Sequence, residues 1–131
     1  MTENDIGTAV VDSAIHLHQQ IGPGLLESVY EAVLMRKLAE RGLRVQRQAA
    51  VPIVIDGVTI DEGFRADLIV EGVVILELKS VEKINPVHKK QLLTYLRLTG
   101  LKLGYLLNFG ELMMKDGITR VINGKIDMPS V

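Results

Sequence analysis

The 131-residue chain contains no cysteine, no tryptophan, and only three tyrosines and two phenylalanines. The absence of cysteine excludes disulfides, thiolate zinc sites, iron–sulfur clusters and cysteine nucleophiles. The scarcity of aromatic rings argues against base stacking as the main source of affinity for a nucleic acid.

A strong net charge and a long apolar run are also lacking. The formal net charge is -1, which argues against binding of nucleic acid through bulk positive charge, so any such contact would be local. No stretch approaches about 18 uncharged apolar residues, and the start MTENDIGTAV lacks the basic-then-apolar order of a signal peptide. We therefore expect no membrane contact and a cytoplasmic location.

What the chain does contain is enough apolar material for one core, since 47% of its residues are hydrophobic. Its length predicts a single domain over residues 1–131. Apolar side chains at three- and four-residue spacing predict one helix from about Asn4 to Ile21 and a second from about Leu25 to Arg41. Gly22-Pro23-Gly24 separates the two helices, because proline cannot continue the hydrogen-bond ladder.

From Val45 the apolar period changes to two, which predicts strands. Asp56-Gly57 supplies the positive φ angles of a tight hairpin turn, and Asn85-Pro86 has the residue types of a helix start. The run 73–76 is apolar on both faces, which indicates a central strand covered on both sides. We expect strands over residues 51–55, 58–60, 66–70, 73–79, 103–109 and 118–122, a third helix over 86–98, and a last hairpin turn at Asp116-Gly117.

The resulting element order is α-α-β-β-β-α-β with a C-terminal β tail. This order predicts an α/β (α+β) fold in which helices flank a central mixed β-sheet. Charged or polar residues interrupt the apolar pattern at four places, and these residues are the candidates for a functional site.

The first place is the end of the most hydrophobic strand, where Glu77 and Lys79 follow the run 73–76. Side chains two residues apart on a strand share a face, so the acid and the base point the same way. A charge pair that emerges into solvent at a strand end is the alternative interpretation.

The second place is Asp67, in the preceding strand. Two carboxylates within a few ångström repel one another unless a cation lies between them, and hard oxygen donors select Mg²⁺ or Mn²⁺. A metal site makes a demand on the register, because a two-residue turn at Glu71-Gly72 would put Asp67 on the opposite face from Glu77. A three-residue connection, or a β-bulge near Asp67, restores the same face. The alternative is an aspartate paired with Arg65.

The third and fourth places lie on helices. Gln91 and Tyr95 share a line with Val87 and Leu98, and we expect this line to be a buried stripe. Inward-facing amide and phenol groups need partners, which a carboxylate site would supply. Glu27, in the first turn of the second helix, is expected to lean toward the core. An ordinary helix flank and a plain N-terminal glutamate are the respective alternatives.

Taken together, these residues resemble a known group of proteins. Asp67, Glu77 and Lys79 match the D…ExK core of the PD-(D/E)XK nuclease superfamily, and QLLTY at 91–95 matches the QxxxY element of its RecB-like branch. GLLESVY at 24–30 is similar to the signature of the GxxExxY protein family within that superfamily. The resemblance implies a restriction-endonuclease-like core and hydrolysis of phosphodiester bonds that depends on Mg²⁺ or Mn²⁺.

The resemblance also implies a metal-ligand set. Asp67 and Glu77 would hold the cation, with the main-chain carbonyl of Leu78 as a further ligand. Glu27 would complete the metal's shell directly or through water. The cation would polarise the phosphate and lower the pKa of a bound water.

The remaining matched residues are implied to act on the water or the phosphate. Lys79 would orient or help to deprotonate the attacking water and stabilise developing negative charge. Gln91 and Tyr95 would position the lysine or the scissile phosphate.

Nucleic acid is the implied partner, and DNA and RNA, single- or double-stranded, stay open. Candidate phosphate contacts are the basic side chains Lys83, His88, Lys89 and Lys90, with Arg65 and Arg97 as further candidates. A solvated basic turn is the alternative interpretation. A nuclease this small often needs a second copy to hold a duplex, so a homodimer also stays open. The alternative function is a non-catalytic accessory or binding module that retains the nuclease fold and acts through a partner or as a homodimer.

Overall fold

A computed structural model describes residues 1–126, so that residues 127–131 at the end of the expected domain lie outside the described part. The helices are α1 (Glu3–Ile21), α2 (Glu27–Glu40) and α3 (Pro86–Thr99), with a short 3-10 helix η1 (Met114–Gly117). The strands are β1 (Val45–Ile55), β2 (Val58–Val70), β3 (Val74–Lys79), β4 (Leu103–Asn108) and β5 (Ile118–Ile122). This order confirms the expected α/β element order.

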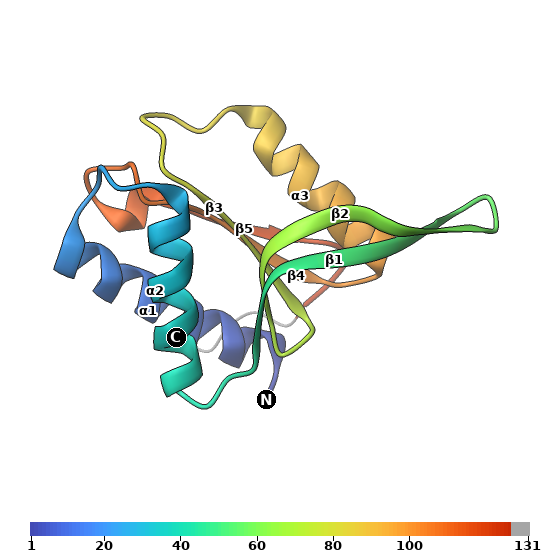
Figure 1. Ribbon diagram of the computed structural model, residues 1–131, viewed down its shortest axis with the longest axis horizontal. Helices are drawn as coiled ribbons and strands as arrows, with labels where there is room; N and C mark the ends of the chain where they lie inside the picture. Colours follow the sequence, from blue (N-terminus) through green and yellow to red (C-terminus); the bar gives the residue numbers. More distant parts are fainter. Residues whose placement is uncertain (127–131) are drawn as a thin grey trace.

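The five strands form one mixed sheet in the order β1-β2-β3-β4-β5. Neighbouring strands are antiparallel except β3 and β4, which are parallel and are joined through α3. Figure 1 shows α1 and α2 on one side of the sheet and α3 on the other, with the β1–β2 hairpin extending well beyond the helices. The predicted architecture, a mixed sheet with helices on both faces, is therefore confirmed.

The core has two layers, one on each face of the sheet. Val74 and Leu76 of β3 pack with α1 and α2, whereas Ile75 between them packs with α3. All three side chains are completely buried, and each buried aliphatic side chain of this size contributes about 1.5–3 kcal/mol. The expectation that this run forms a central strand covered on both sides is confirmed.

The helix start at Asn85-Pro86 and the hairpin turn at Asp56-Gly57 have the conformations that the sequence predicts. Asn85 caps α3, since its side chain accepts a hydrogen bond from the Val87 N–H at 3.0 Å. Asp56 and Gly57 have φ angles of 52° and 75°, as a primed hairpin turn requires.

Three boundaries differ from the expected ones. β1 begins at Val45, six residues before the expected start at residue 51, because its ladder with β2 already starts at the Val45–Val70 pair. Residues 58–60 and 66–70 are one continuous strand, β2, because the hairpin ladder with β1 continues along its length. Asp116-Gly117 is part of η1 and does not form a hairpin turn, although the return strand β5 does pair with β4 as expected. In the part of the chain that the structure describes, no helix is long and apolar enough to cross a membrane.

A buried asparagine fixes the chain where it leaves β3. Asn108 is completely buried and lies opposite Lys79 in the β3–β4 ladder. Its side-chain oxygen accepts hydrogen bonds from the Val81 and Gly110 N–H groups at 3.1 and 3.0 Å, and its amide donates to the Val81 carbonyl at 2.9 Å. The segment after Lys79 is therefore held in place through main-chain groups.

We expect Asn108→Leu to destabilise the protein by about 2–4 kcal/mol, because it leaves partly buried main-chain donors and an acceptor at Val81 and Gly110 without the Asn108 side chain as partner. Urea unfolding followed by circular dichroism measures this loss. Asn123→Leu, at a half-buried position whose side-chain amide donates to the carbonyls of Leu96 and Leu101, is the control and should cost clearly less. Equal unfolding midpoints for Asn108→Leu and wild type would contradict the assigned role.

Candidate active site

The connection between β2 and β3 brings Asp67 and Glu77, the two acids of the D…ExK pattern, together. Val70 pairs with Val74 and Leu68 with Leu76, so residues 71–73 form a three-residue connection. The same register places Asp67 opposite Glu77, with both side chains on one face. A metal site requires Asp67 and Glu77 on the same face of the sheet, and the structure meets this requirement through the three-residue connection.

Asp67 is held by hydrogen bonds to both carboxylate oxygens. Its Oδ2 accepts from the Leu78 N–H at 2.8 Å, and its Oδ1 accepts from Gln48 Nε2 at 3.3 Å. Arg65 instead pairs with Glu62 at 2.6 Å and donates to the Gln48 carbonyl. The alternative interpretation, an aspartate paired with Arg65, is therefore wrong.

Glu77 is half-buried beside Asp67, and its buried Oε1 atom has no hydrogen-bond partner among the described residues. Burial, the charge of Asp67 and a hydrogen bond with Asp67 together raise the pKa of the Glu77 carboxyl to about 9. Lys79 acts in the opposite direction and favours the charged form. A divalent cation that joined the pair would therefore favour the charged form of Glu77.

Lys79 ends β3 on the same face as Glu77. Its main-chain carbonyl accepts from the Phe109 N–H at 2.8 Å, which ties the strand end to β4. Among the residues that the structure describes, its side chain makes no ion pair within 4.0 Å. The Lys79 ammonium therefore lies near the carboxylate pair without being bound by it.

Tyr95 of α3 lies close enough to the carboxylate pair for both charges to act on its phenol. Its ring stacks on Phe64 with centroids 3.8 Å apart and an interplanar angle of 2°. Burial raises the pKa of the Tyr95 phenol, and the charges of Glu77 and Asp67 raise it further. The structure thus brings Tyr95 into the electrostatic field of both acids.

The line through Gln91 and Tyr95 is not the buried stripe that we expected. Gln91 is exposed, Tyr95 is half-buried, and Val87 and Leu98 are 57% and 40% exposed. The helix instead packs on the sheet through Leu92 and Leu96. Apolar residues lie on several lines of α3, so their spacing alone did not define which line is buried.

Glu27 also lies differently from the expectation that it leans toward the core. It is the first residue of α2 and is exposed. It lines a shallow pocket with Leu25, Leu26, Ser28 and Ser80. Because Ser80 follows Lys79 directly, Glu27 still lies near the end of β3, on the solvent side.

The loop before α2 is fixed to the end of β3. Tyr30 is completely buried, donates its hydroxyl proton to the Gly22 carbonyl at 2.6 Å and stacks on Phe109. Ser80 Oγ donates to the Leu25 carbonyl at 2.6 Å. The segment 24–30 therefore acts as a structural unit, with its tyrosine as an anchor and its glutamate at the surface.

The sequence did not indicate two residues that adjoin the site, Glu31 and Gln48. Glu31 is only 4% exposed, and Gln48 bridges it to Asp67. Glu31 lies three and seven residues before the buried Leu34 and Leu38, a spacing that marks it as inward-facing. No comparable pattern exists for Gln48, because polar residues on either strand face are common near an exposed sheet edge and nothing in the sequence around it distinguishes this glutamine.

The residues at this site fit a divalent cation. The unpartnered Glu77 Oε1 beside Asp67 is the supporting observation. Within residues 1–126, no group of three or more His, Asp or Glu side chains could hold a metal, and the site itself brings two carboxylates together. That number suits Mg²⁺, which is often bound by one or two carboxylates together with waters and substrate phosphates.

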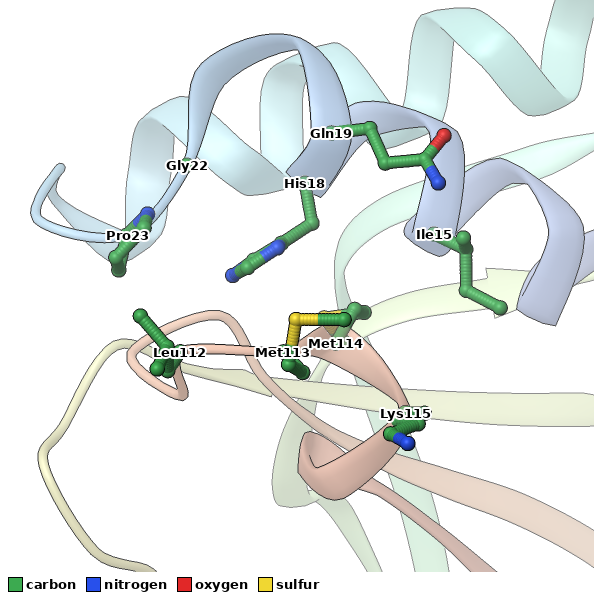
Figure 2. A pocket seen from close by; sticks show the side chains of 9 residues that line it. All are labelled: Ile15, His18, Gln19, Gly22, Pro23, Leu112, Met113, Met114 and Lys115. Carbon is green, nitrogen blue, oxygen red and sulfur yellow. The ribbon is translucent and has the colours of Figure 1, made fainter.

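A separate pocket of about 420 Å³ lies between the end of α1 and the segment that leads into η1. His18 points into it above Leu112 and Met113, and Pro23 borders it (Figure 2). No acid is among its lining residues: Ile15, His18, Gln19, Gly22, Pro23, Leu112, Met113, Met114 and Lys115. The carboxylate chemistry therefore lies elsewhere, at the end of β3.

Comparison with known proteins gives one match. A family model described as the PD-(D/E)XK nuclease superfamily matches residues 4–121. No curated protein and no solved structure matches the chain significantly.

We expect Glu77→Gln to stabilise the metal-free protein increasingly as pH rises. In the wild type the folded pKa of about 9 exceeds that of the unfolded chain, so the folded state binds the extra proton and loses stability between these two pKa values, by up to about 1.4 kcal/mol per pH unit. The glutamine carries no titrating proton and avoids repulsion with Asp67.

Urea unfolding of both proteins in EDTA from pH 5 to pH 9 measures this difference. Glu62→Gln, at an exposed position on β2, serves as the control and should follow the wild-type curve. Parallel curves for wild type and Glu77→Gln would contradict the assigned burial of the charge.

Proposed function

Since the chain belongs to the PD-(D/E)XK nuclease superfamily, we propose that it is a small metal-dependent nuclease that hydrolyses phosphodiester bonds of nucleic acid. The observation that carries the proposal is the register of β2 and β3, which sets Asp67 against Glu77 with an oxygen of Glu77 unpartnered. We further propose that residues 1–131 form one nuclease-like domain. Within the superfamily, the segment 24–30 favours the GxxExxY family.

Asp67 and Glu77 would hold the cation, with the Leu78 carbonyl and Glu27 as further donors. When bound, Mg²⁺ or Mn²⁺ polarises the phosphate and lowers the pKa of a bound water. The Leu78 N–H already bonds Asp67 at 2.8 Å, which fixes the main chain at the position of the proposed carbonyl ligand. The exposure of Glu27 suits a donor that acts through water.

Lys79 would orient the attacking water and stabilise the negative charge that develops on the phosphate. Its side chain is suited to this role because it lies beside the acids without being paired to them. Tyr95 and Gln91 would position Lys79 or the phosphate from α3. The stack on Phe64 restricts the Tyr95 ring to one orientation.

The first turn of α3 is the proposed contact with the nucleic-acid backbone. Lys89 and Lys90 are exposed there, and Lys83 is exposed on the loop that leads to the helix. Free N–H groups at a helix N-terminus favour phosphate, and contacts of this kind do not depend on base sequence. A duplex held in this way would be shared by two copies in a homodimer.

The net charge of -1 supports a second candidate function, because it gives the chain little general affinity for nucleic acid. In that case the protein is an accessory or binding module with a nuclease fold, and it reaches nucleic acid through a partner. Such a module would bind without cleaving.

We expect the purified protein to cleave at least one substrate in a panel of single- and double-stranded DNA and RNA with Mn²⁺. Asp67→Asn and Lys79→Met should each reduce the rate by about 100-fold or more, since each removes a group that acts on the water or the phosphate. Gel-based cleavage assays measure the rate.

Asp61→Asn and Lys102→Met, at exposed positions away from the site, are the matched controls and should retain full activity. Equal cleavage by Asp67→Asn and wild type would point to a contaminant and contradict the proposal. Mn²⁺ binding without cleavage by any variant would favour the accessory module.

We also expect Mn²⁺ binding at pH 7.5 to release close to one proton. A carboxylate must be charged to bind the metal, and the Glu77 carboxyl has a pKa of about 9, so apparent affinity should rise with pH up to that value. Calorimetry in two buffers with different ionisation enthalpies measures the released protons, and Glu77→Gln should release none. Proton-free binding by the wild type would contradict the assignment of Glu77 as a ligand.

A further inference from the structure

We propose that Gln48 is a positioning residue for Asp67, and that Glu31 sets the orientation of the Gln48 amide. The inference rests on the proposed function, because its purpose is to hold Asp67 ready for a cation. It adds β1 to the site, and it adds Glu31 of α2 beside Glu27; neither element supplies a residue of the D…ExK core.

The side chain of Gln48 lies between two carboxylates. Its Nε2 is 3.0 and 3.1 Å from the two oxygens of Glu31 and 3.3 Å from Asp67 Oδ1. Charged carboxylates only accept hydrogen bonds, and an amide nitrogen has two hydrogens to donate. Only the NH₂ end of Gln48 can therefore occupy this position, with one hydrogen for each acid.

Glu31 is held in place by contacts that do not involve Gln48. It is 4% exposed on α2, and Arg47 Nε donates to its Oε1 at 2.8 Å. Arg47 also donates to the Ser28 carbonyl at 3.2 Å, which ties β1 to the first turn of α2. Because Arg47 balances the charge of Glu31, the buried acid can orient the amide without adding net charge near Asp67.

The backbone at Gln48 is in the left-handed region, and this conformation directs its side chain toward Glu31 and Asp67. Its φ angle is 49°, and the other non-glycine residues with positive φ among the described residues, Asp56 and Glu71, lie in turns. The ladder keeps one register on both sides of the position, with Arg47 opposite Leu68 and Ala49 opposite Ala66. Left-handed backbone inside a strand is unfavourable for a residue with a Cβ, and such strain is concentrated at functional sites.

The consequence for Asp67 is a fixed carboxylate plane. Leu78 N–H bonds one oxygen and Gln48 bonds the other, so rotation of the carboxylate would break one contact or both. A carboxylate has about four lone-pair sites, so about two remain for a cation. Partners of this kind, one bond removed from the metal, orient the ligand and tune the affinity of the site.

Gln48→Asn is the sharpest test. Asparagine tolerates the left-handed region but is one methylene shorter, so the backbone is kept and the contact to Asp67 is lost. Mn²⁺ affinity, measured by electron paramagnetic resonance, should fall about 10-fold. Gln46→Asn, two residues away on the same strand and exposed, should bind Mn²⁺ like the wild type.

Gln48→Gly is the second variant, because glycine adopts this backbone without strain and the variant is expected to fold. It should show the same loss of Mn²⁺ affinity, and its unfolding temperature in EDTA should stay within about 3 °C of wild type. A merely structural role for Gln48 would change the unfolding temperature and leave Mn²⁺ affinity intact.

Glu31→Gln tests the second half of the inference. If Glu31 acts through Gln48, the double variant Glu31→Gln, Gln48→Asn should bind Mn²⁺ no more weakly than Gln48→Asn alone. Independent, additive losses would overturn the role of Glu31.

The outcomes separate the two proposals. Wild-type protein that does not bind Mn²⁺ would overturn the proposed function and this inference with it. Wild-type binding that is abolished by Asp67→Asn but unchanged in Gln48→Asn and Gln48→Gly would leave the proposed function intact and overturn the role of Gln48.

Discussion

The buried contact between two acids is the constraint on which the rest of the site depends. Asp67 and Glu77 face one another because residues 71–73 form a connection of three residues, and one residue fewer would turn Asp67 to the opposite face. Burial and mutual repulsion oppose two charges at this position and raise the pKa of the Glu77 carboxyl to about 9. The neighbouring groups reduce this repulsion or limit its effect. Leu78 N–H and Gln48 donate hydrogen bonds to Asp67, and Lys79 lies near the two acids without forming an ion pair with either of them.

Three segments distant in the sequence meet at the end of β3 and keep it rigid. Asn108 holds the main chain at Val81, Ser80 holds the loop before α2, and Tyr30 anchors that loop against Phe109. All of these contacts are made to main-chain groups or to an aromatic ring. The end of β3 is therefore positioned by the fold as a whole, which leaves the side chains of Glu77 and Lys79 available for chemistry.

The sequence predicted those features that depend on local patterns. The N-terminal cap of α3, the turn at Asp56-Gly57 and the double-sided burial of β3 each follow from a few neighbouring residues. The face of α3 was not predictable, because apolar residues occupy several lines of the helix and only packing on the sheet selects Leu92 and Leu96. Gln48 was not predictable either, since its role depends on a backbone angle that glutamine does not favour and on a carboxylate from α2.

The left-handed residue in β1 has a second consequence. β1 is the edge of the sheet, and an edge strand offers a free row of N–H and C=O groups to any other extended chain. Gln48 interrupts the regular backbone of that row, and the register shift between Val51 and Ile53, where Pro52 also lacks an N–H, interrupts it again. The edge is thereby divided into pieces too short to template another strand, so the conformation that aims an amide at Asp67 also protects the molecule from edge-to-edge aggregation.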